Sequence, residues 1–507
     1  MKQSRYCLIG AILAAGSFRA STTQAQERST HIRTGHGHSI VDVRNNAQAP
    51  TDGAVAGGSF PHPQPRLAGF SPLVAIATSD KKRPPFDDSP WEHTVENSFD
   101  GNMINLFPEA PYIIGFLDSG AVVDLTSDFY GFVLGLTGEY LTENTIPIGG
   151  VGGTVNAFIT QPVGYFAAGL SAINGAGELN FAALKGHSNV SVVVGPDLDC
   201  GNGEELTAVV GTPLMSFFNS VIRVDSPRRV LYDERYFLSP DVQILNQTAA
   251  LPTFPRRVAM ELGGLSPVLT ASFFPDFEFL ETPIVPTMLS LTPLSFPTGA
   301  LYFSEMLLRQ GPASPENLGT TALVMVDTGA QASIISPGIA AALNLPLEPD
   351  FTVNICGVGG LVENVPGYYV DFVQINALGG ALRFSRAPFV VLDLQSPAGG
   401  PMDGILGMNF FWNRNIIFEP SLVGTPFLHV SNPVPFAAPD FDLDLHVDAP
   451  DTRILGACVT GPGPGLATPD CAHTDLDEDG DVDLADFAVL QTCFGGPDLL
   501  ANTACGH

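Results

Sequence analysis

One short stretch occurs twice in this chain of 507 residues, and the repeat constrains the fold more than any other feature of the sequence. The first copy reads YIIGFLDSGAVVDLTS (112–127), and the second reads ALVMVDTGAQASIIS (322–336). In each copy an apolar run ends in an acid, Asp118 or Asp327, followed by a hydroxyl residue, glycine and alanine. Self-similarity of this kind indicates a duplicated structural unit.

The similarity continues beyond the acids. IGGVGGTVNAF (148–158) matches ICGVGGLVENV (355–365), with GVGG beginning 32 and 30 residues after the respective acid. TAVVGTPLMSFFNSVIRVD (207–225) then matches DGILGMNFFWNRNIIFE (403–419). Three landmarks in one order predict two related lobes.

The short apolar runs between many glycines and prolines indicate β-structure with many turns. We expect strands at 112–117, 122–126, 145–149, 191–195, 207–210, 220–224, 300–306, 322–326, 332–336, 351–356, 367–375, 387–393 and 415–418, and a short helix at 336–346. The predicted fold class is therefore mainly β, with two related β-barrel lobes and a small α-helical C-terminal domain. The expected divisions are a signal peptide (1–25), a flexible leader or propeptide (26–100), an N-terminal lobe (101–225), an inter-lobe connection (226–289), a C-terminal lobe (290–432) and a calcium-binding module (433–507).

The two acids are suited to act as a pair. Lobes that each present one acid at a strand end can bring Asp118 and Asp327 together across an approximate twofold axis. Two carboxyls within hydrogen-bond reach cannot both ionise cheaply, so they share one proton, and one acts as base while the other acts as acid. Such a pair can activate a water for peptide hydrolysis without a covalent intermediate. We therefore expect both acids to be catalytic.

The residues around the acids fit the same role. The hydroxyls of Ser119 and Thr328 can bond to the backbone of the opposite lobe, while Gly120 and Gly329 permit tight turns. The VVG and ILG segments are expected to pair with the acid-bearing strands and brace them. The GVGG turns are expected to form mobile hairpins, or flaps, over a substrate. The flap residues are Gly150, Gly152, Gly153, Gly357, Gly359 and Gly360.

These motifs resemble those of the aspartic peptidases. The chain resembles pepsin-like members in having two lobes and retropepsin-like members in the detail of its motifs. VDTGAQASIIS and DGILGMNFF carry the resemblance most strongly, and it covers about 110–225 and 300–420. The first lobe departs from it by having Asp124 where the second lobe has Ser333. The resemblance implies aspartic-peptidase-like lobes, an aspartic endopeptidase, a polypeptide substrate and no catalytic cofactor. One alternative stays open, which is a catalytically inactive extracellular binding or scaffold protein.

A second signal lies near the C-terminus. DLDEDGDVDLAD (475–486), the second acidic loop, has the ligand spacing of an EF-hand calcium loop, with glycine at position 6 and valine at position 8. Hard oxygen ligands at alternate positions can wrap one Ca²⁺ ion. The predicted ligands are Asp475, Asp477, Asp479, Asp481 through its carbonyl, Asp483 and Asp486.

DFDLDLHVDAPD (440–451), the first acidic loop, repeats this spacing 35 residues earlier. It departs by having Leu445 in place of the glycine and Pro450 within the loop. Two such loops, each followed by a helix, resemble a dockerin type I module, which implies a cohesin-like protein partner. A calcium-stapled terminal module without that partner is the alternative. The predicted ligands of the first loop are Asp440, Asp442, Asp444, Asp448 and Asp451.

The N-terminus predicts export. Lys2 and Arg5 precede the apolar run 6–18, and a plausible cleavage site ends at Ala25. The alternative reading of this apolar run is a buried N-terminal helix. No later segment is apolar enough over about 18 residues to predict a membrane span. Acids outnumber bases 52 to 22, and the net charge of −30 argues against nucleic acid or an anionic membrane as partner. We expect a secreted, extracellular or cell-surface protein.

The cysteines fit an oxidising compartment. Six remain once Cys7 leaves with the signal, and four of them lie in the last 50 residues. Near-equal spacings favour one disulfide in each unit of the tail, Cys458–Cys471 and Cys493–Cys505, with other pairings left open. Whether Cys200 pairs with Cys356 is also open.

Overall fold

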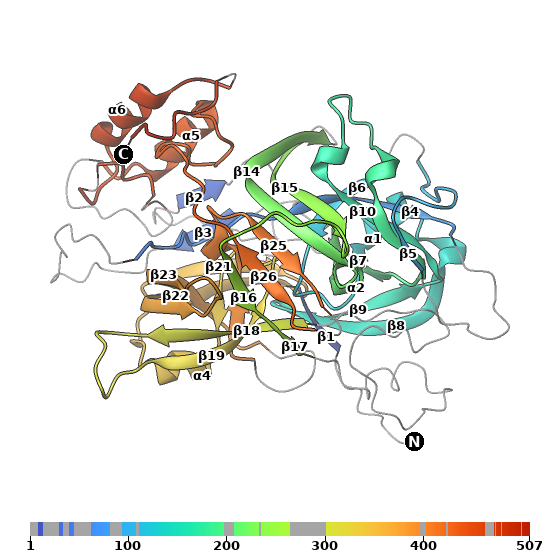
Figure 1. The fold of residues 1–507 in the computed structure, drawn as a ribbon, viewed down its shortest axis with the longest axis horizontal. Coiled ribbons are helices and arrows are strands. Elements are labelled where there is room, and N and C mark those ends of the chain that lie inside the picture. Colours follow the sequence, from blue (N-terminus) through green and yellow to red (C-terminus); the bar gives the residue numbers. More distant parts are fainter. Residues whose placement is uncertain are drawn as a thin grey trace.

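The computed structural model describes residues 9–13, 30–33, 40–44, 62–81, 94–107, 111–196, 207–232, 235–263, 301–394, 402–421, 424–461, 471, 473–477, 479–497 and 499–506. This part of the chain is mainly β, as the sequence predicts. It forms two large sheets, a smaller sheet that joins strands from both halves, and a helical C-terminal module (Figure 1).

The elements follow in the order of hydrogen-bonded neighbours. The first sheet contains β1 (Ile9–Leu13), β8 (Leu141–Gly150), β9 (Gly153–Thr160), β12 (Val193–Gly195), β7 (Leu125–Ser127), β13 (Ala208–Val210), β6 (Ile113–Leu117), β4 (Leu73–Ser79), β10 (Val163–Gly169), β11 (Lys185–Val190) and β5 (Thr94–Glu96). The second contains β17 (Glu261–Gly263), β18 (Leu301–Arg309), β19 (Thr320–Val326), β24 (Gly404–Leu406), β20 (Ile334–Ile335), β23 (Leu382–Val391), β22 (Gly360–Ile375), β21 (Phe351–Gly357), β3 (Ile40–Arg44) and β2 (Thr30–Arg33). The joining sheet contains β15 (Arg235–Asn246), β14 (Phe218–Tyr232), β25 (Ile416–Glu419), β26 (Phe427–Val430) and β16 (Arg256–Ala259). The α-helices are α1 (Asp128–Val133), α2 (Thr212–Met215), α4 (Pro337–Ala342), α5 (Ala449–Cys458) and α6 (Leu484–Cys493).

The duplication in the sequence is also present in the strand order. β12, β7, β13 and β6 are neighbours in the first sheet, and β23, β20, β24 and β19 repeat that order in the second. β6 runs parallel to β13, and β19 runs parallel to β24. The prediction that the VVG and ILG segments brace the acid-bearing strands is therefore confirmed.

Each predicted strand overlaps an observed one, and the predicted helix at 336–346 corresponds to α4. Ser336 caps this helix, because its hydroxyl accepts from Ile339 N at 3.2 Å, and Pro337 occupies the first turn. The strands that the sequence did not reveal include β4, β10 and β15.

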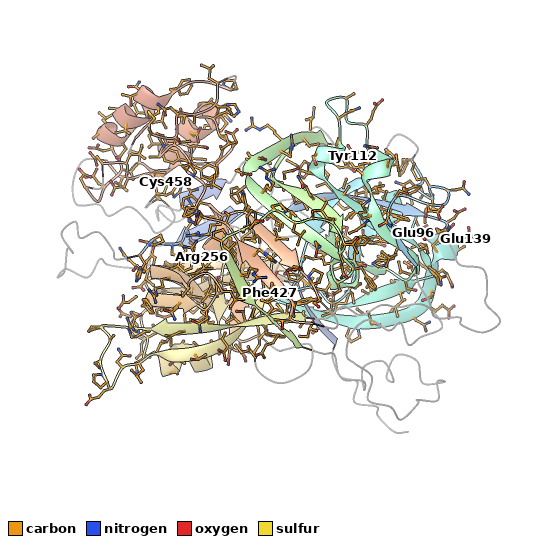
Figure 2. The ribbon with its side chains drawn as sticks, in the orientation of Figure 1. Glu96, Tyr112, Glu139, Arg256, Phe427 and Cys458 are labelled. Atoms are coloured by element: carbon orange, nitrogen blue, oxygen red, sulfur yellow. A yellow bond between two sulfur atoms is a disulfide. The ribbon has the colours of Figure 1, made fainter. Side chains whose placement is uncertain are left out.

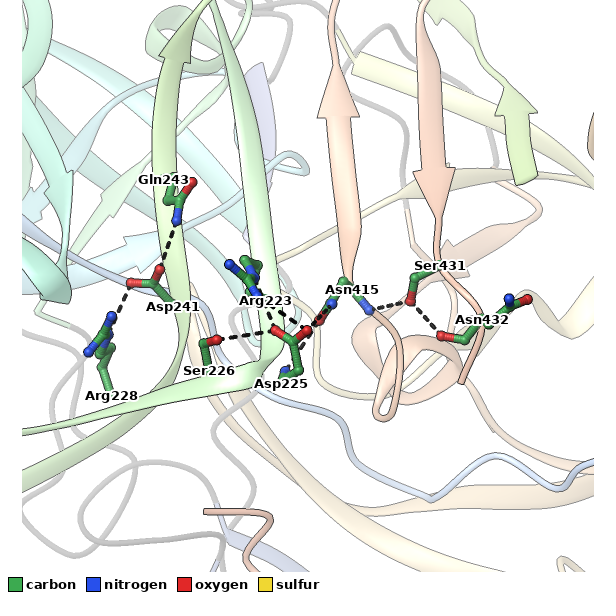
Figure 3. A network of polar contacts seen from close by, with 9 residues as sticks. All are labelled: Arg223, Asp225, Ser226, Arg228, Asp241, Gln243, Asn415, Ser431 and Asn432. Atoms are coloured by element: carbon green, nitrogen blue, oxygen red, sulfur yellow. Dashed lines mark hydrogen bonds and ion pairs between the residues drawn. The ribbon is translucent and has the colours of Figure 1, made fainter. Parts of the chain in front are cut away.

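The joining sheet ties the two halves together. β14 pairs antiparallel with β25, so that Val221 lies opposite Ile417. Asn415 donates to Asp225 Oδ2 at 2.8 Å and accepts from Asp225 N at 3.3 Å (Figure 3). The predicted connection at 226–289 is therefore part of the fold as far as it is described, since β14 crosses its N-terminal boundary and β15 and β16 lie in this sheet.

The predicted leader at 26–100 differs from the structure. Leu73–Ser79 form β4, which lies between β6 and β10, and all seven side chains are buried. The segment LVAIATS is apolar or small throughout, which suits a strand covered on both faces. The prediction of a loose lead-in is therefore wrong for residues 73–79.

Most of the predicted export signal lies outside the described residues. Residues 9–13 form β1, which pairs parallel with β8, so the alternative of a buried N-terminal helix is wrong for these five residues. Export itself stays a prediction. None of the described helices is long and apolar enough to cross a membrane.

The C-terminal module has its own small core. Val447, Leu455, Val482 and Leu490 are among its buried residues. Disulfides join Cys458 to Cys471 and Cys493 to Cys505, so the predicted pairing is confirmed. Figure 2 labels Cys458 in this module, apart from Arg256 and Phe427 on the joining sheet. Cys200 lies outside the described residues.

Candidate active site

The two acids follow directly on equivalent strands. Asp118 directly follows β6 and donates its N–H to Val210 O at 2.9 Å, whereas Asp327 directly follows β19 and donates its N–H to Leu406 O at 3.1 Å. Both side chains are buried, with 0% and 1% exposed. The parallel partner strands thus fix each acid at the same point of its lobe.

The hydroxyl residues beside the acids exchange hydrogen bonds between the lobes. Thr328 Oγ1 donates to Leu117 O at 2.8 Å and accepts from Ser119 N at 3.0 Å. Ser119 Oγ mirrors this by donating to Val326 O at 2.8 Å and accepting from Thr328 N at 3.0 Å. All four residues are buried, so these four bonds hold the two acid-bearing strand ends together without competition from water.

The glycines after the hydroxyl residues are needed for space. Gly120 N and Gly329 N donate to the Oδ1 atoms of Asp118 and Asp327 at 2.7 and 2.8 Å. A methyl group at Gly120 would lie 2.4 Å from Asp327 Oδ2, and one at Gly329 would lie 2.4 Å from Asp118 Cγ. Each glycine therefore makes room for the carboxyl of the opposite lobe.

The two carboxyls lie within hydrogen-bond reach of each other. Their Oδ2 atoms are buried, and neither forms a hydrogen bond of normal length with a described residue. Burial raises the pKa of Asp118 to about 6, although its interaction with the Asp327 carboxyl acts to lower that pKa. Burial also raises the pKa of Asp327 well above its ordinary value, and the charge of Asp118 raises it further. The pair therefore retains one proton between its two carboxyls.

Asp124 and Ser333 hold equivalent backbone groups. Asp124 Oδ1 accepts from Gly211 N at 2.8 Å, and Ser333 Oγ accepts from Gly407 N at 2.9 Å. Ser333 also donates to Asn409 Oδ1 at 2.7 Å. Burial raises the pKa of Asp124 to about 8. The substitution in the first lobe thus keeps the support of the bracing strand, because a buried carboxyl replaces a hydroxyl.

The two GVGG turns are the tips of hairpins, and the tips touch. β8 and β9 meet at Gly150 and Gly153, while β21 and β22 meet at Gly357 and Gly360. Across the lobes, Gly152 N donates to Val358 O at 3.0 Å.

Side chains at the hairpin tips are also buried. Val151 and Val358 are 8% and 0% exposed, and they belong to the same apolar cluster as Ala121 and Ala330 beside the acids. The close packing of the tips depends on glycine, because a methyl group at Gly359 would lie 2.3 Å from a backbone nitrogen of the opposite tip. The two hairpins therefore meet in a closed arrangement on the same apolar cluster as the acids.

Sequence reasoning missed a segment that supports the second acid loop. Gly69 N donates to Gln331 O at 2.8 Å, and Gln331 Nε2 donates to Ser71 Oγ at 2.8 Å. Asn409 Nδ2 donates to Arg66 O at 3.2 Å. This segment lies in the predicted leader, where no local pattern marks a contact with residues about 260 to 340 positions away.

The second acidic loop is held by its own acids. Asp475 accepts from Asp479 N at 3.2 Å and from Gly480 N at 2.9 Å. Asp486 accepts from Asp483 N at 2.7 Å and also from the amides of residues 476 and 477. Side-chain oxygens of Asp475, Asp477 and Asp479 lie within 4.8 Å of one another, whereas Asp483 caps α6 through Ala485 N. Asp481, whose backbone carbonyl is the predicted calcium ligand, lies two residues before this cap.

The first acidic loop has the same pattern. Asp440 accepts from Asp444 N and Leu445 N, both at 3.1 Å, as Asp475 does in the second loop. Asp451 accepts from Asp448 N at 2.8 Å and from the amides of residues 441 and 442, as Asp486 does. Oxygens of Asp440, Asp442 and Asp444 again lie within 4.8 Å of one another. Both loops therefore gather three carboxylates, although their surroundings differ.

Comparisons with known proteins find an aspartyl-protease match within the second lobe. The family model described as Aspartyl protease matches residues 316–410, which include Asp327, the second hairpin and ILGMNF. Among solved structures, an aspartic proteinase from Irpex lacteus is similar with 10% sequence identity and a TM-score of 0.36, covering 72% of this chain and 98% of that one. A comparison with curated proteins finds no match.

The hydroxyl exchange predicts a stability effect. Thr328→Val keeps the shape but leaves Leu117 O and Ser119 N unpaired, and each such buried group costs about 1–3 kcal/mol. Denaturant unfolding of the whole chain should show this loss, whereas Thr328→Ser, which copies the first lobe, should stay close to the native stability. Equal stability of the valine variant would contradict the importance of the exchange.

The hairpin contact predicts an effect on local opening. In Gly152→Ala the added methyl group would lie 2.4 Å from Gly359 C, so the tips must separate. Amide exchange at 148–155 and 355–361 should become about tenfold faster, the equivalent of one hydrogen bond. Gly175→Ala is the control, because a methyl group there meets nothing within 4 Å. Unchanged exchange in Gly152→Ala would mean that the tips do not hold each other.

Proposed function

We propose that this protein is a secreted aspartic endopeptidase that hydrolyses peptide bonds with a water activated between Asp118 and Asp327. One observation carries the proposal. Two buried acids from equivalent strand ends lie within hydrogen-bond reach and are held there by the exchange between Ser119 and Thr328. Neutralising one acid while the other stays charged is the electrostatic condition for acid–base chemistry on a peptide.

The pKa shifts favour one assignment of base and acid to Asp118 and Asp327. Asp118 has the lower pKa of the two and acts as base. It removes a proton from the water while the water oxygen attacks the carbonyl carbon of the peptide. Asp327 donates its proton to the carbonyl oxygen, which gives a neutral diol. In the second step Asp118 returns its proton to the amide nitrogen, the C–N bond breaks, and Asp327 recovers a proton from the diol. Each acid ends in the state in which it began.

The hairpins suit a polypeptide substrate. A chain lying between the lobes would be covered by two tips, which must part at the Gly152–Val358 hydrogen bond to admit it. Backbone groups of the hairpin strands can bond an extended peptide as an added strand. Apolar side chains around the acids exclude water and strengthen the electrostatic effects.

Hydrolysis of casein by the purified chain, with and without pepstatin, tests the proposal. Asp327→Asn should reduce hydrolysis by about 10²–10⁴-fold, because it removes the acid of the pair. Asp128→Asn is the matched control, since Asp128 is exposed at the start of α1. Hydrolysis that survives Asp327→Asn would contradict the assignment. Absence of hydrolysis under all conditions would favour a non-enzymatic binding or scaffold protein.

The pKa shifts predict a pH dependence. Below about pH 6 both acids hold protons, so no base is present. As the pH rises through about 6, Asp118 loses its proton while Asp327 keeps its own, and kcat/KM should rise. Measurement of kcat/KM from pH 3 to 8 should therefore show an acid limb near pH 6 and activity extending toward neutrality. An optimum well below pH 5 would contradict these roles.

We also propose that the second acidic loop binds Ca²⁺ and that the tail is dockerin-like. The support is the gathering of Asp475, Asp477 and Asp479, held by backbone N–H groups, with Gly480 at a φ of +96° at the sharp turn. Carboxylate oxygens are the ligands that Ca²⁺ prefers. A cohesin-like partner and export through the N-terminal signal belong to the same proposal. A calcium titration without any site in the whole chain would contradict the calcium proposal.

A further inference from the structure

In the first acidic loop the backbone uses some carboxylate oxygens and leaves others available. Asp444 Oδ1 accepts from His446 N at 2.9 Å, and Asp442 Oδ1 accepts from Asp444 N at 3.3 Å. Asp442 Oδ2 is buried and accepts no hydrogen bond from the described residues, and none from the loop backbone reaches Asp444 Oδ2. These two Oδ2 atoms remain for a cation, as does Asp448 Oδ1, which is buried without a partner among the described residues.

A cationic side chain already lies at the two Oδ2 atoms. Arg229 belongs to β14 of the joining sheet, and its Nη2 atom is 2.9 Å from Asp444 Oδ2 and 3.8 Å from Asp442 Oδ2. The carboxylate side chains are 6% and 0% exposed, whereas that of Arg229 is 32% exposed. An opposite charge stabilises a buried carboxylate in its charged form, and here the lobes supply that charge.

Leu445, which departs from the calcium-loop pattern, packs against the lobes together with Leu443. Leu443 and Leu445 adopt φ values of +61° and +70°, which are uncommon for leucine. Leu443 is buried in a cluster with Val224 and Phe436, and Leu445 packs against that cluster. Packing against the lobes thus explains why leucine occupies a position where the second acidic loop has glycine.

A second arginine closes the same interface. Arg66 Nη1 donates to Phe441 O at 3.0 Å, and its guanidinium lies 4.4 Å above the ring centroid of Trp412. Trp412 follows the ILGMNFF segment of the second lobe, so this contact connects the first acidic loop to the region that braces Asp327.

The second acidic loop has none of these contacts. Asp475, Asp477 and Asp479 form no ion pair with any described residue, and Asp477 and Asp479 are more exposed than their counterparts Asp442 and Asp444. Gly480 supplies the positive φ without strain. Two loops with one backbone pattern therefore differ in what neutralises them.

We propose that the first acidic loop is an intramolecular docking site, in which the guanidinium of Arg229 takes the place of Ca²⁺ and fastens the C-terminal module to the lobes. The protein then binds one Ca²⁺, in the second acidic loop. The count of one ion rests on the proposed calcium role of that loop, whereas the docking role does not. Arg229 and Ca²⁺ exclude each other, because both need the Oδ2 atoms of Asp442 and Asp444.

Calcium titration of full-length variants tests this inference. Asp477→Ala removes a ligand of the second loop, because alanine carries no side-chain oxygen, and Arg229→Gln is then added to that variant. Arg228→Gln is the matched control, because Arg228 pairs with Asp241 on the neighbouring strand at 3.4 Å (Figure 3) and forms no ion pair with the first acidic loop. Arg229→Lys keeps the positive charge and controls for loss of folding. The readouts are calorimetric stoichiometry and the change of Tm on adding Ca²⁺.

We expect one site in the native chain, none in Asp477→Ala, none after adding Arg228→Gln or Arg229→Lys, and one after adding Arg229→Gln. Calcium should raise the Tm of the Asp477→Ala/Arg229→Gln protein alone among these double variants. Two sites in the native chain, or none in that double variant, would overturn the docking role. A native chain without any site, combined with one site in the double variant, would refute only the calcium role of the second loop.

Discussion

The meeting of two buried carboxyls at equivalent strand ends is the constraint on which the rest of this structure depends. Asp118 and Asp327 have lost nearly all contact with water, and a second negative charge beside the first would be strongly unfavourable. The pair is stable because amide N–H groups of each loop bond its Oδ1 atoms and the lobes exchange hydroxyl bonds around it. The approximate twofold symmetry of the sheets follows from the need to present two equivalent strand ends at one point.

The two lobes meet this requirement by different chemistry. In the second lobe the hydroxyl of Ser333, which also bonds Asn409, holds the end of the bracing strand, while in the first lobe a buried carboxyl of Asp124 takes that place. Because burial raises the pKa of Asp124 to about 8, it adds no charge to the pair near neutral pH. The divergence of the first lobe therefore lies in support of the acid, while the acid and its hydroxyl partner are retained.

The C-terminal module illustrates one motif in two environments. Both acidic loops have the same spacing and the same backbone hydrogen bonds, so the sequence predicts the same ion in each. What differs is the neighbour, since Arg229 from β14 reaches the first loop and no described cation reaches the second. A guanidinium and a calcium ion are alternative ways to neutralise a cluster of carboxylates.

The sequence by itself determined what depends on short stretches of chain. These are the strand ends that carry the acids, the glycine hairpins, the bracing strands, the tail disulfides and the backbone geometry of the acidic loops, each specified by local periodicity, turn chemistry or spacing. Only the tertiary structure decided which distant groups meet. β4 inside the first sheet, the contact of Gly69 with Gln331, the touching hairpin tips and the ion pair of Arg229 join positions that share no local pattern. Such contacts arise from packing and charge compensation across the whole fold, and local sequence patterns do not predict them.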